Sequence, residues 1–406
     1  MVSVVDAGQA EEVLLSFMES PSFIQASTNA SRLVSRLKCD VQSKQLYLVH
    51  QDLRNIYFRF SNRKEKIEPL NTLLYHGAMY LLSSNEIITG QDIALLLLEI
   101  SSKLLQNLHD SGDRRKFEDE LSDPRMKYHI DNKTVSLSIC QQVTSIAVKL
   151  PDNELGKPKF IAETLKILTP KILNRDLLHH SLADSFWRHR DYVNARYHFL
   201  NCATVDNAED IGNMLVEYHG MRANKNEVDL FISQFIFQLL CLQSPIDVPR
   251  APCKQESANS CVFAISRKTR STIKSIAAKI FSTYTLKHPL LNQVEVPFSS
   301  LPLLNFTYFT ISILNSGHQE ADVFKVLNSI YKTTINRDPD FQTYLTRIGT
   351  IYFGIVDRQK QQQQQGGFFN NILMSLLEGT DEDDDDDYDD DECNRSNNMS
   401  LCDELD

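Results

Sequence analysis

LADSFWRHRDYVNARYHFLNC, residues 182–202, has the pattern of two short helices joined by a tight turn. Ala183 and Ala195 are small enough to let two paired helices approach closely, and aromatic side chains such as Phe186 fill the gap to a neighbouring pair. Ala195 and Phe199 keep the A-x3-F spacing of tetratricopeptide repeats. This stretch therefore predicts a helical hairpin of the tetratricopeptide type.

Apolar residues outside this hairpin also recur with a helical period and do not alternate as they would along a strand. In Gln45–Phe60, for example, Leu46, Val49, Leu53 and Ile56 fall on one stripe. Only 13 Gly and 13 Pro occur in 406 residues, which is few for a sandwich or barrel with its many turns. Helices are expected over Gln45–Phe60, Glu68–Leu82, Asp92–Leu108, Thr134–Leu150, Lys159–Leu173, Asp176–His189, Tyr192–Ala203, Ala208–Tyr218, Glu227–Leu242, Ser271–Tyr284, Pro302–Leu314, Asp322–Tyr331 and Phe341–Phe353.

Many helices joined by short turns are typical of a solenoid, although the other segments do not keep the tetratricopeptide period of about 34 residues. We therefore predict an all-α protein, an α-solenoid of tetratricopeptide-like helical hairpins with a disordered acidic C-terminal tail. The expected segments are a flexible N-terminal segment (1–27), an N-terminal and central α-solenoid (28–243), a flexible basic insertion (244–270), a C-terminal, partner-binding α-solenoid (271–357), and a Gln-rich linker with a short amphipathic helix and the acidic tail (358–406).

The formal net charge of −11 comes from one stretch near the C-terminus. Residues 381–392, DEDDDDDYDDDE, hold 11 acidic residues and no basic one. Without them the 53 acidic residues fall to 42, which equals the number of Lys and Arg. The body is therefore nearly neutral, which argues against a nucleic acid as partner, because such binding usually needs a strongly basic domain.

The same sequence predicts a cytosolic protein without direct insertion into a membrane. No stretch reaches the length of about 18 apolar residues that a spanning helix needs. The N-terminus lacks the charged start and the apolar run of a signal peptide. Eight Cys are scattered without CxxC pairs, as expected for free thiols in a reducing compartment.

The search for catalytic, cofactor and metal motifs predicts none of these sites. Neither a Walker phosphate loop nor a GxGxxG motif is present. The cluster of His179, His180, His189 and His198 has neither the His i,i+4 pair with Glu nor the paired Cys of a zinc site, so packing or surface roles are favoured. No Cys has the local signature of a nucleophile. We expect a protein that is not an enzyme; a hydrolase whose site is assembled only in space is the alternative from another class.

A basic segment extends from Ser31 to Lys66, with nine basic and three acidic residues. Arg32 and Arg36 are four residues apart and therefore share one helix face. This segment is either a solvated face or a docking surface for an acidic partner, selected by complementary charge.

Several blocks of sequence carry a resemblance to a known family. They are His50-Gln51, Leu53-Arg54, Tyr57–Phe60, Gly77-Ala78, Tyr197–Leu242, Tyr284-Thr285, Pro302–Phe306, Arg337–Pro339 and Phe353-Gly354. Together they span most of residues 30–377 and resemble the Golgi-to-ER traffic protein 4 family, the helical adaptor of the guided-entry pathway for tail-anchored membrane proteins. The resemblance implies a non-catalytic α-solenoid that bridges a client-targeting ATPase and a ubiquitin-like protein or BAG-domain scaffold.

The resemblance also implies two docking regions. The residues expected to contact the ATPase lie in the N-terminal half: Arg32, Arg36, Lys38, Tyr47, His50, Gln51, Arg54 and Asp92. The residues expected to contact the ubiquitin-like or BAG-domain partner lie in the C-terminal half: Phe281, Tyr284, Phe306 and Phe309. For these four aromatic residues a core role would produce the same apolar pattern.

This chain departs from the family in its longer basic insertion, its Gln run at 361–365 and its Asp-rich run. The alternative function is a helical-repeat scaffold subunit of another assembly, of the proteasome-lid or initiation-factor type. Such subunits usually end in a winged-helix module with short strands, whereas Phe341–Gly354 has a helical pattern.

Overall fold

In the computed structural model every regular element of the described residues is a helix, so the prediction of an all-α protein is confirmed. The structure describes residues 6–115, 125–153, 155–168, 173–242, 267–292, 296–298, 300–316 and 321–355. The helices up to the predicted hairpin are α1 (Ala7–Glu19), α2 (Pro21–Ala26), α3 (Ser31–Gln42), α4 (Leu46–Phe60), α5 (Ile67–Ser83), α6 (Ile87–Arg115), α7 (Arg125–Lys149), α8 (Lys157–Leu168) and α9 (Arg175–Arg188). The later helices are α10 (Tyr192–Asn201), α11 (Ala208–Arg222), α12 (Val228–Cys241), α13 (Arg267–Lys287), α14 (Pro302–Asn315), α15 (Ala321–Ile330), α16 (Lys332–Ile335) and α17 (Pro339–Phe353). Three short 3-10 turns are η1 (Thr28–Ala30), η2 (Lys64–Lys66) and η3 (Lys225–Glu227).

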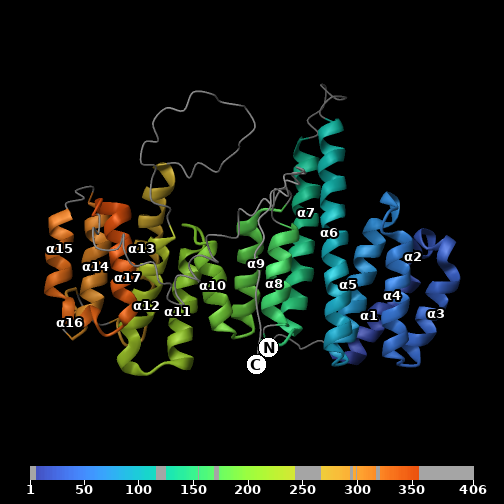
Figure 1. The fold of residues 1–406 in the computed structure, drawn as a ribbon, viewed down its shortest axis with the longest axis horizontal. Coiled ribbons are helices and arrows are strands. Elements are labelled where there is room, and N and C mark those ends of the chain that lie inside the picture. Colours follow the sequence, from blue (N-terminus) through green and yellow to red (C-terminus); the bar gives the residue numbers. More distant parts are fainter. Residues whose placement is uncertain are drawn as a thin grey trace, which may run out of the picture. The chain divides into compact units, whose positions relative to one another are not determined.

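Helices that are close in the chain pack against one another. α5 packs on α4 and α6, α9 on α10, and α11 on α13, while α6 also contacts α8 and α7 contacts α9. Within the unit Met1–Arg358, Figure 1 shows most helices following one another in chain order, from α2–α4 in blue to α14–α16 in orange, while α1 lies beside α5 and α17 beside α12. Packing between near neighbours in the chain is the pattern of a solenoid, so the α-solenoid prediction is confirmed.

The hairpin of α9 and α10 forms where the sequence predicts it. Ala183 and Ala195 are fully buried between the two helices, and Phe186 is buried beside them. Arg190 has a φ of 60°, in the left-handed region, which reverses the chain within the short turn. The backbone N–H of Asp191 then donates to the carbonyl of Phe186 at 2.9 Å and closes the end of α9. Small residues, an aromatic filler and a tight turn therefore act together, as expected for a tetratricopeptide-like pair.

The sequence predicts a flexible segment over residues 1–27, and the described residues 6–27 contain two helices. These residues form α1 and α2, and α1 packs against α3 and α5. Leu14 and Met18 lie four residues apart on α1, and both are buried. The side chain of Asp6 accepts a hydrogen bond from the backbone N–H of Ala7 at 2.7 Å at the start of the helix. The apolar stripe of α1 is short, and it is stabilised by burial against α5 more than by local propensity.

The helices before and after the predicted insertion form one continuous array. α13 packs on α11 and α12, and α17 packs on α12. The hydroxyl of Tyr284 donates to the carbonyl of Val228 at 2.9 Å, and Arg337 pairs with buried Asp229 at 2.6 Å. Residues 28–243 and 271–357 are thus not separate arrays. Most of the predicted insertion (244–266), the Gln-rich linker, the predicted helix over 368–377 and the acidic tail lie outside the described residues.

Most predicted helices occur within a few residues of their expected bounds, and the largest differences are in α6 and α7. The sequence predicts Asp92–Leu108 for the first and Thr134–Leu150 for the second, whereas both helices extend further. Residues 109–115, HDSGDRR, are polar, so an apolar period does not reveal that the helix continues through them.

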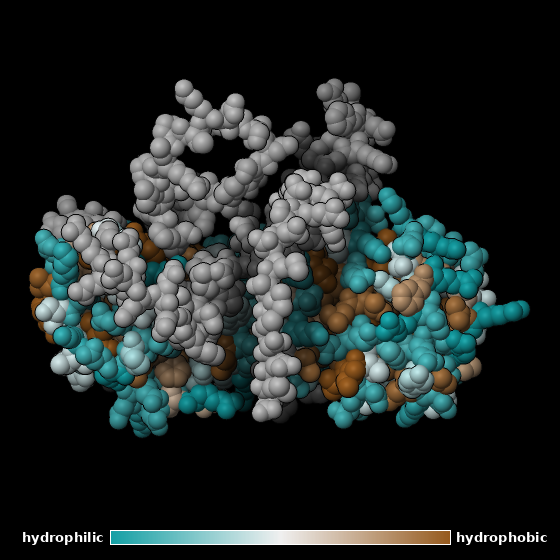
Figure 2. Space-filling view, in the orientation of Figure 1, coloured by the Kyte–Doolittle hydropathy of each residue, from teal (hydrophilic) through white to brown (hydrophobic). Residues whose placement is uncertain are grey.

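The surface of the first helices is mainly hydrophilic. Figure 2 shows this over the end of the array that holds α3 and α4, where separate hydrophobic patches interrupt the hydrophilic surface. Among the described residues, no helix has the length and apolar character needed to cross a membrane.

Candidate partner-docking site

The outer side of α4 presents one stripe of polar and aromatic side chains. The stripe follows the helical spacing i, i+3, i+4, i+7 and i+11, whereas Val49, Leu53 and Ile56 are buried on the opposite side. We call this stripe, together with one carboxylate of α6, the α4 face: Tyr47, His50, Gln51, Arg54, Phe58 and Asp92.

Asp92 joins the α4 face to α6. Its Oδ2 lies 2.8 Å from Nε2 of His50, and its two carboxylate oxygens accept bonds from Nη1 of Arg54 at 3.0 and 3.1 Å. The three side chains are only partly exposed, since His50 is 15% and Asp92 34% accessible. The structure therefore brings Asp92 together with His50 and Arg54, which lie about 40 positions earlier in the sequence, and hydrogen bonds within the chain hold the three side chains together.

The aromatic members of the α4 face are the parts most open to a partner. Tyr47 is 66% exposed and Phe58 is 62% exposed. Nε2 of Gln51 donates to the hydroxyl of Tyr47 at 2.7 Å, and the guanidinium of Arg54 lies 5.9 Å from the ring centre of Phe58. Both aromatic rings are thus oriented by a polar neighbour, which lowers the entropy that is lost when a partner covers them.

The three basic residues of α3 do not share one surface. Arg36 makes a two-bond pair with Asp52 of α4, with Nε donating to Oδ2 at 2.8 Å, and Lys38 pairs with Glu19 of α1. Arg32 is exposed, and it forms no ion pair within the described part of the chain. Of these three basic residues of α3, Arg32 is therefore the one whose charge is available to an acidic partner.

Arg36 contacts α4 on a different side from the one that carries the α4 face. Its partner Asp52 is buried, 3% exposed, and lies two residues beyond His50. Two residues correspond to about 200° around a helix. Arg36 and Asp52 thus join α3 to α4, while His50 and Arg54 join α4 to α6. The first pair is part of the helix packing, and the second borders the exposed face.

Three of the four C-terminal candidates are core residues. Phe281 is 5% exposed, whereas Tyr284 and Phe306 are fully buried. The hydroxyl of Tyr284 is satisfied within the fold, and the ring of Phe306 packs 5.8 Å from that of Phe237. Phe309 is 36% exposed. Only Phe309 presents a side chain to a partner, so the core role that the sequence left open holds for the other three.

The buried thiols have the environment of structural cysteines. Burial raises the pKa of Cys140 to about 11 and the pKa values of Cys202 and Cys241 to about 12. These thiols stay protonated at neutral pH, whereas a nucleophile must be a thiolate. Among the described residues there is also no group of three His, Cys, Asp or Glu that could hold a metal ion.

Phe58 is the member of the α4 face that is absent from the docking residues expected from the sequence. It lies four residues after Arg54, so the helical stripe through Tyr47 and Arg54 already passes through it. Ile88 at the start of α6 is 86% exposed and was also not singled out. It lies four residues before Asp92, on the helix that carries the carboxylate of the α4 face. Helical spacing from Arg54 and Asp92 would have found both.

Known proteins resemble this chain over most of its length. The family profile described as Golgi to ER traffic protein 4 matches residues 64–377. A Golgi to ER traffic protein 4 homolog from Oryzias latipes is 30% identical over 349 residues, which is 84% of this chain and 88% of that protein. The homolog from Homo sapiens is 29% identical over 336 residues, 81% of each chain. The profile begins after α4, so it includes Asp92 and the four C-terminal candidates but not the rest of the α4 face.

One solved structure has a similar fold. The crystal structure of C. therm. Get4 superposes with a TM-score of 0.52 at 17% sequence identity, covering 86% of this chain and 95% of that chain. At this level of identity the likeness concerns the arrangement of helices.

Proposed function

Because this chain belongs to the Golgi to ER traffic protein 4 family, we propose that it is a non-enzymatic adaptor in the post-translational delivery of tail-anchored membrane proteins to the ER. In this proposal it bridges an ATPase that carries the clients and a ubiquitin-like or BAG-domain chaperone partner, and it acts in the cytosol. Cys140, Cys202 and Cys241 are free thiols inside the fold, which is compatible with a reducing compartment.

The observation that best supports the adaptor role is the α4 face. Exposed aromatic side chains beside fixed charged groups are typical of the centre of a protein interface. Tyr47 and Phe58 supply the exposed rings, and His50, Arg54 and Asp92 supply the fixed polar groups. We assign the contact with the ATPase to the α4 face and to Arg32 of the preceding helix, α3.

The proposed C-terminal docking region is supported by exposed apolar side chains. On α15, Val323, Val326 and Ile330 lie at i, i+3 and i+7 and are 44%, 57% and 68% exposed. Phe309 of α14 is exposed as well. Two docking regions on one scaffold raise the effective concentration of each partner for the other, which is how an adaptor speeds transfer without catalysing a reaction.

The alternative of a proteasome-lid or initiation-factor type subunit has no support in the described C-terminal residues. Residues 300–316 and 321–355 contain helices and no strand pair of a winged-helix module.

Tyr47→Ala is expected to weaken binding of the purified ATPase to the full chain about 30-fold, because truncating an interface hot spot usually removes 2 kcal/mol or more. Isothermal titration calorimetry measures this change. Tyr47 is largely exposed, so folding is expected to be unaffected. Leu286→Ala, at a 70% exposed position of α13, is the matched control and should bind normally. Equal affinities of the two variants would contradict the assignment of the α4 face.

Arg32→Glu is expected to weaken the same interaction about tenfold at low salt and much less at high salt, because exposed charges are screened. Arg32 is a cleaner test than Arg36 or Lys38, since reversing either of those also breaks a pair within the chain. Arg222→Glu reverses an exposed arginine of α11 and serves as control. Unchanged affinity of Arg32→Glu at low salt would remove this residue from the interface.

A further inference from the structure

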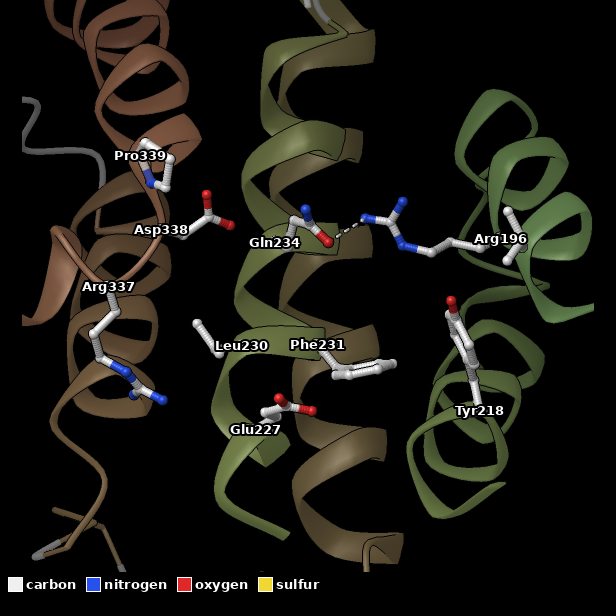
Figure 3. Close-up of a pocket in the computed structure, with 10 residues that line it drawn as sticks. Arg196, Tyr218, Glu227, Leu230, Phe231, Gln234, Arg337, Asp338 and Pro339 are labelled. Carbon is white, nitrogen blue, oxygen red and sulfur yellow. Dashed lines mark hydrogen bonds between the residues drawn. The ribbon is translucent and has the colours of Figure 1, made fainter. Parts of the chain in front are cut away.

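A pocket of about 300 Å³ lies on the outer side of α12, away from the α4 face. Leu230, Phe231 and Gln234 of α12 line it in the middle. Figure 3 shows Arg196 and Tyr218 on one side of α12 and the turn 337–339 on the other, with Arg196 extended towards Gln234.

Arg196 enters this pocket without an acidic partner among the described residues. Its Nη2 donates to the amide oxygen of Gln238 at 2.5 Å and to that of Gln234 at 3.4 Å. Its Nε and Nη1 have no hydrogen-bond partner within the described part of the chain. The guanidinium also lies 5.7 Å from the ring centre of Phe235. Two neutral amides and an aromatic ring therefore surround a full positive charge.

The second arginine of the pocket has the partner that Arg196 lacks. Nη1 of Arg337 donates to Oδ2 of Asp229 at 2.6 Å, and Asp229 is 1% exposed. A charge that leaves water usually has such a partner, because burying it alone is costly. Burial lowers the pKa of Arg196, as expected for a charge whose hydrogen-bond partners are neutral amides. Arg196 is the cationic group of this pocket that is free to bind an anion.

The two carboxylates of the pocket accept hydrogen bonds from backbone N–H groups at the starts of helices. Glu227 accepts the backbone N–H of Asn224 at 3.0 Å, and Asp338 accepts that of Asp340 at 2.9 Å. Both are therefore held next to their own turns and form no ion pair with Arg196. The positive end of the pocket at Arg196 remains uncompensated.

We propose that this pocket binds a peptide segment of a partner protein through an acidic side chain, with the carboxylate on Arg196 and an adjacent apolar side chain against Leu230 and Phe231. The planar guanidinium presents its unused N–H groups in a fork that matches a carboxylate. Leu230 and Phe231 offer an apolar surface beside the guanidinium, and a volume near the lower end of ligand pockets suits two side chains and exceeds that of a lone inorganic anion. This inference goes beyond the proposed function, because it assigns a third docking site on α10–α12 that does not depend on the ATPase contact.

The experiment is selection from a random peptide library displayed on phage, with the full chain as bait and the full chain carrying Arg196→Gln as counter-selection. The selected peptides are expected to share Asp or Glu at one position with an apolar residue nearby. A synthetic peptide of the selected sequence should bind Arg196→Gln about 10- to 100-fold more weakly than the unchanged protein, as for loss of a charge-assisted hydrogen bond. Replacing the shared acid by its amide in the peptide should cause a similar loss.

Three variants and one competitor make the outcome decisive. Arg222→Gln removes an exposed arginine of α11 outside the pocket and should bind the peptide normally. Arg196→Lys keeps the charge but loses the fork, so it should restore only part of the affinity. Circular dichroism and thermal unfolding verify that Arg196→Gln is folded. If it does not fold, Leu230→Ala takes its place and should also weaken binding of the peptide. Failure to select an acidic peptide, equal binding by Arg196→Gln, or full displacement by inorganic phosphate would overturn the proposal.

Discussion

Replacing Phe237 with alanine is expected to lower the free energy of unfolding by about 3–5 kcal/mol, the usual range for truncating a buried Phe. Phe237 of α12 is fully buried. Its ring packs edge to face on Phe306 of α14 at 5.8 Å and on Phe341 of α17 at 5.3 Å. The cavity would lie among three helices that are also held by other contacts, so no single neighbour can move in to fill it. The three helices form one packing unit, and the loss should therefore affect all of them.

Equilibrium unfolding of the full chain in urea, followed by circular dichroism, measures this effect. Phe58→Ala is the matched control, because it removes an equally large ring from a position that is 62% exposed. Substitutions at such exposed positions usually change stability by less than about 0.5 kcal/mol. If Phe237→Ala were no more destabilising than Phe58→Ala, the aromatic junction of α12, α14 and α17 would not be part of the stabilising core.

Acidification from pH 7 to pH 4.5 is expected to remove about 4–5 kcal/mol of stability through two buried histidines, His179 and His288. Burial lowers the pKa of His179 and of His288 from 6.5 to about 4. The unfolded chain therefore binds these protons more tightly than the folded chain. The stability is fully present above pH 6.5, falls as the pH drops from 6.5 towards 4, and has no further contribution to lose below 4. Each of the two rings accounts for about 2–3 kcal/mol of the stability lost by pH 4.5, at about 1.36 kcal/mol per pKa unit.

The hydrogen bonds of His288 and its neighbour His219 explain why protonation is unfavourable. Nε2 of His219 donates to the carbonyl of Asn224 at 3.0 Å, so its Nδ1 must accept from Nε2 of His288, 3.0 Å away. Nδ1 of His288 accepts the backbone N–H of Leu290 at 3.1 Å. Each ring nitrogen of His219 and His288 is therefore already used as the donor or the acceptor of one hydrogen bond. An added proton therefore has no acceptor and replaces an existing bond.

The pH dependence is measured by urea unfolding at a series of pH values between 7 and 4.5. His288→Gln keeps a donor and an acceptor but does not titrate, so the acid-induced loss should shrink by about 2 kcal/mol. His180→Gln at an exposed position should leave the loss unchanged. Identical pH profiles of all three proteins would show that the buried pair does not contribute.

Helical class and family were predictable from the sequence because both depend on local patterns. The stripe Val49, Leu53 and Ile56 marks the inner side of α4 without any knowledge of its neighbours. The small residues Ala183 and Ala195 likewise mark a close helix contact. Long-range structure was less accessible. Leu14 and Met18 lie on a short stripe that becomes part of the core only because α5 is there to cover it.

The docking residues show the same division. Tyr47, Arg54 and Phe58 follow from the periodicity of one helix, whereas the pairing of Asp92 with His50 and Arg54 depends on how α6 packs against α4. The sequence treats Tyr284, Phe306 and Phe309 alike, because hydrophobicity does not say whether another helix covers a ring. Packing buries the first two and leaves Phe309 exposed. Likewise, every arginine has the same charge in the sequence, and only the fold supplies Asp229 to Arg337 while giving Arg196 two neutral amides. Periodicity thus specifies which side of a helix is apolar, and the neighbours that tertiary structure brings decide which groups remain free to bind.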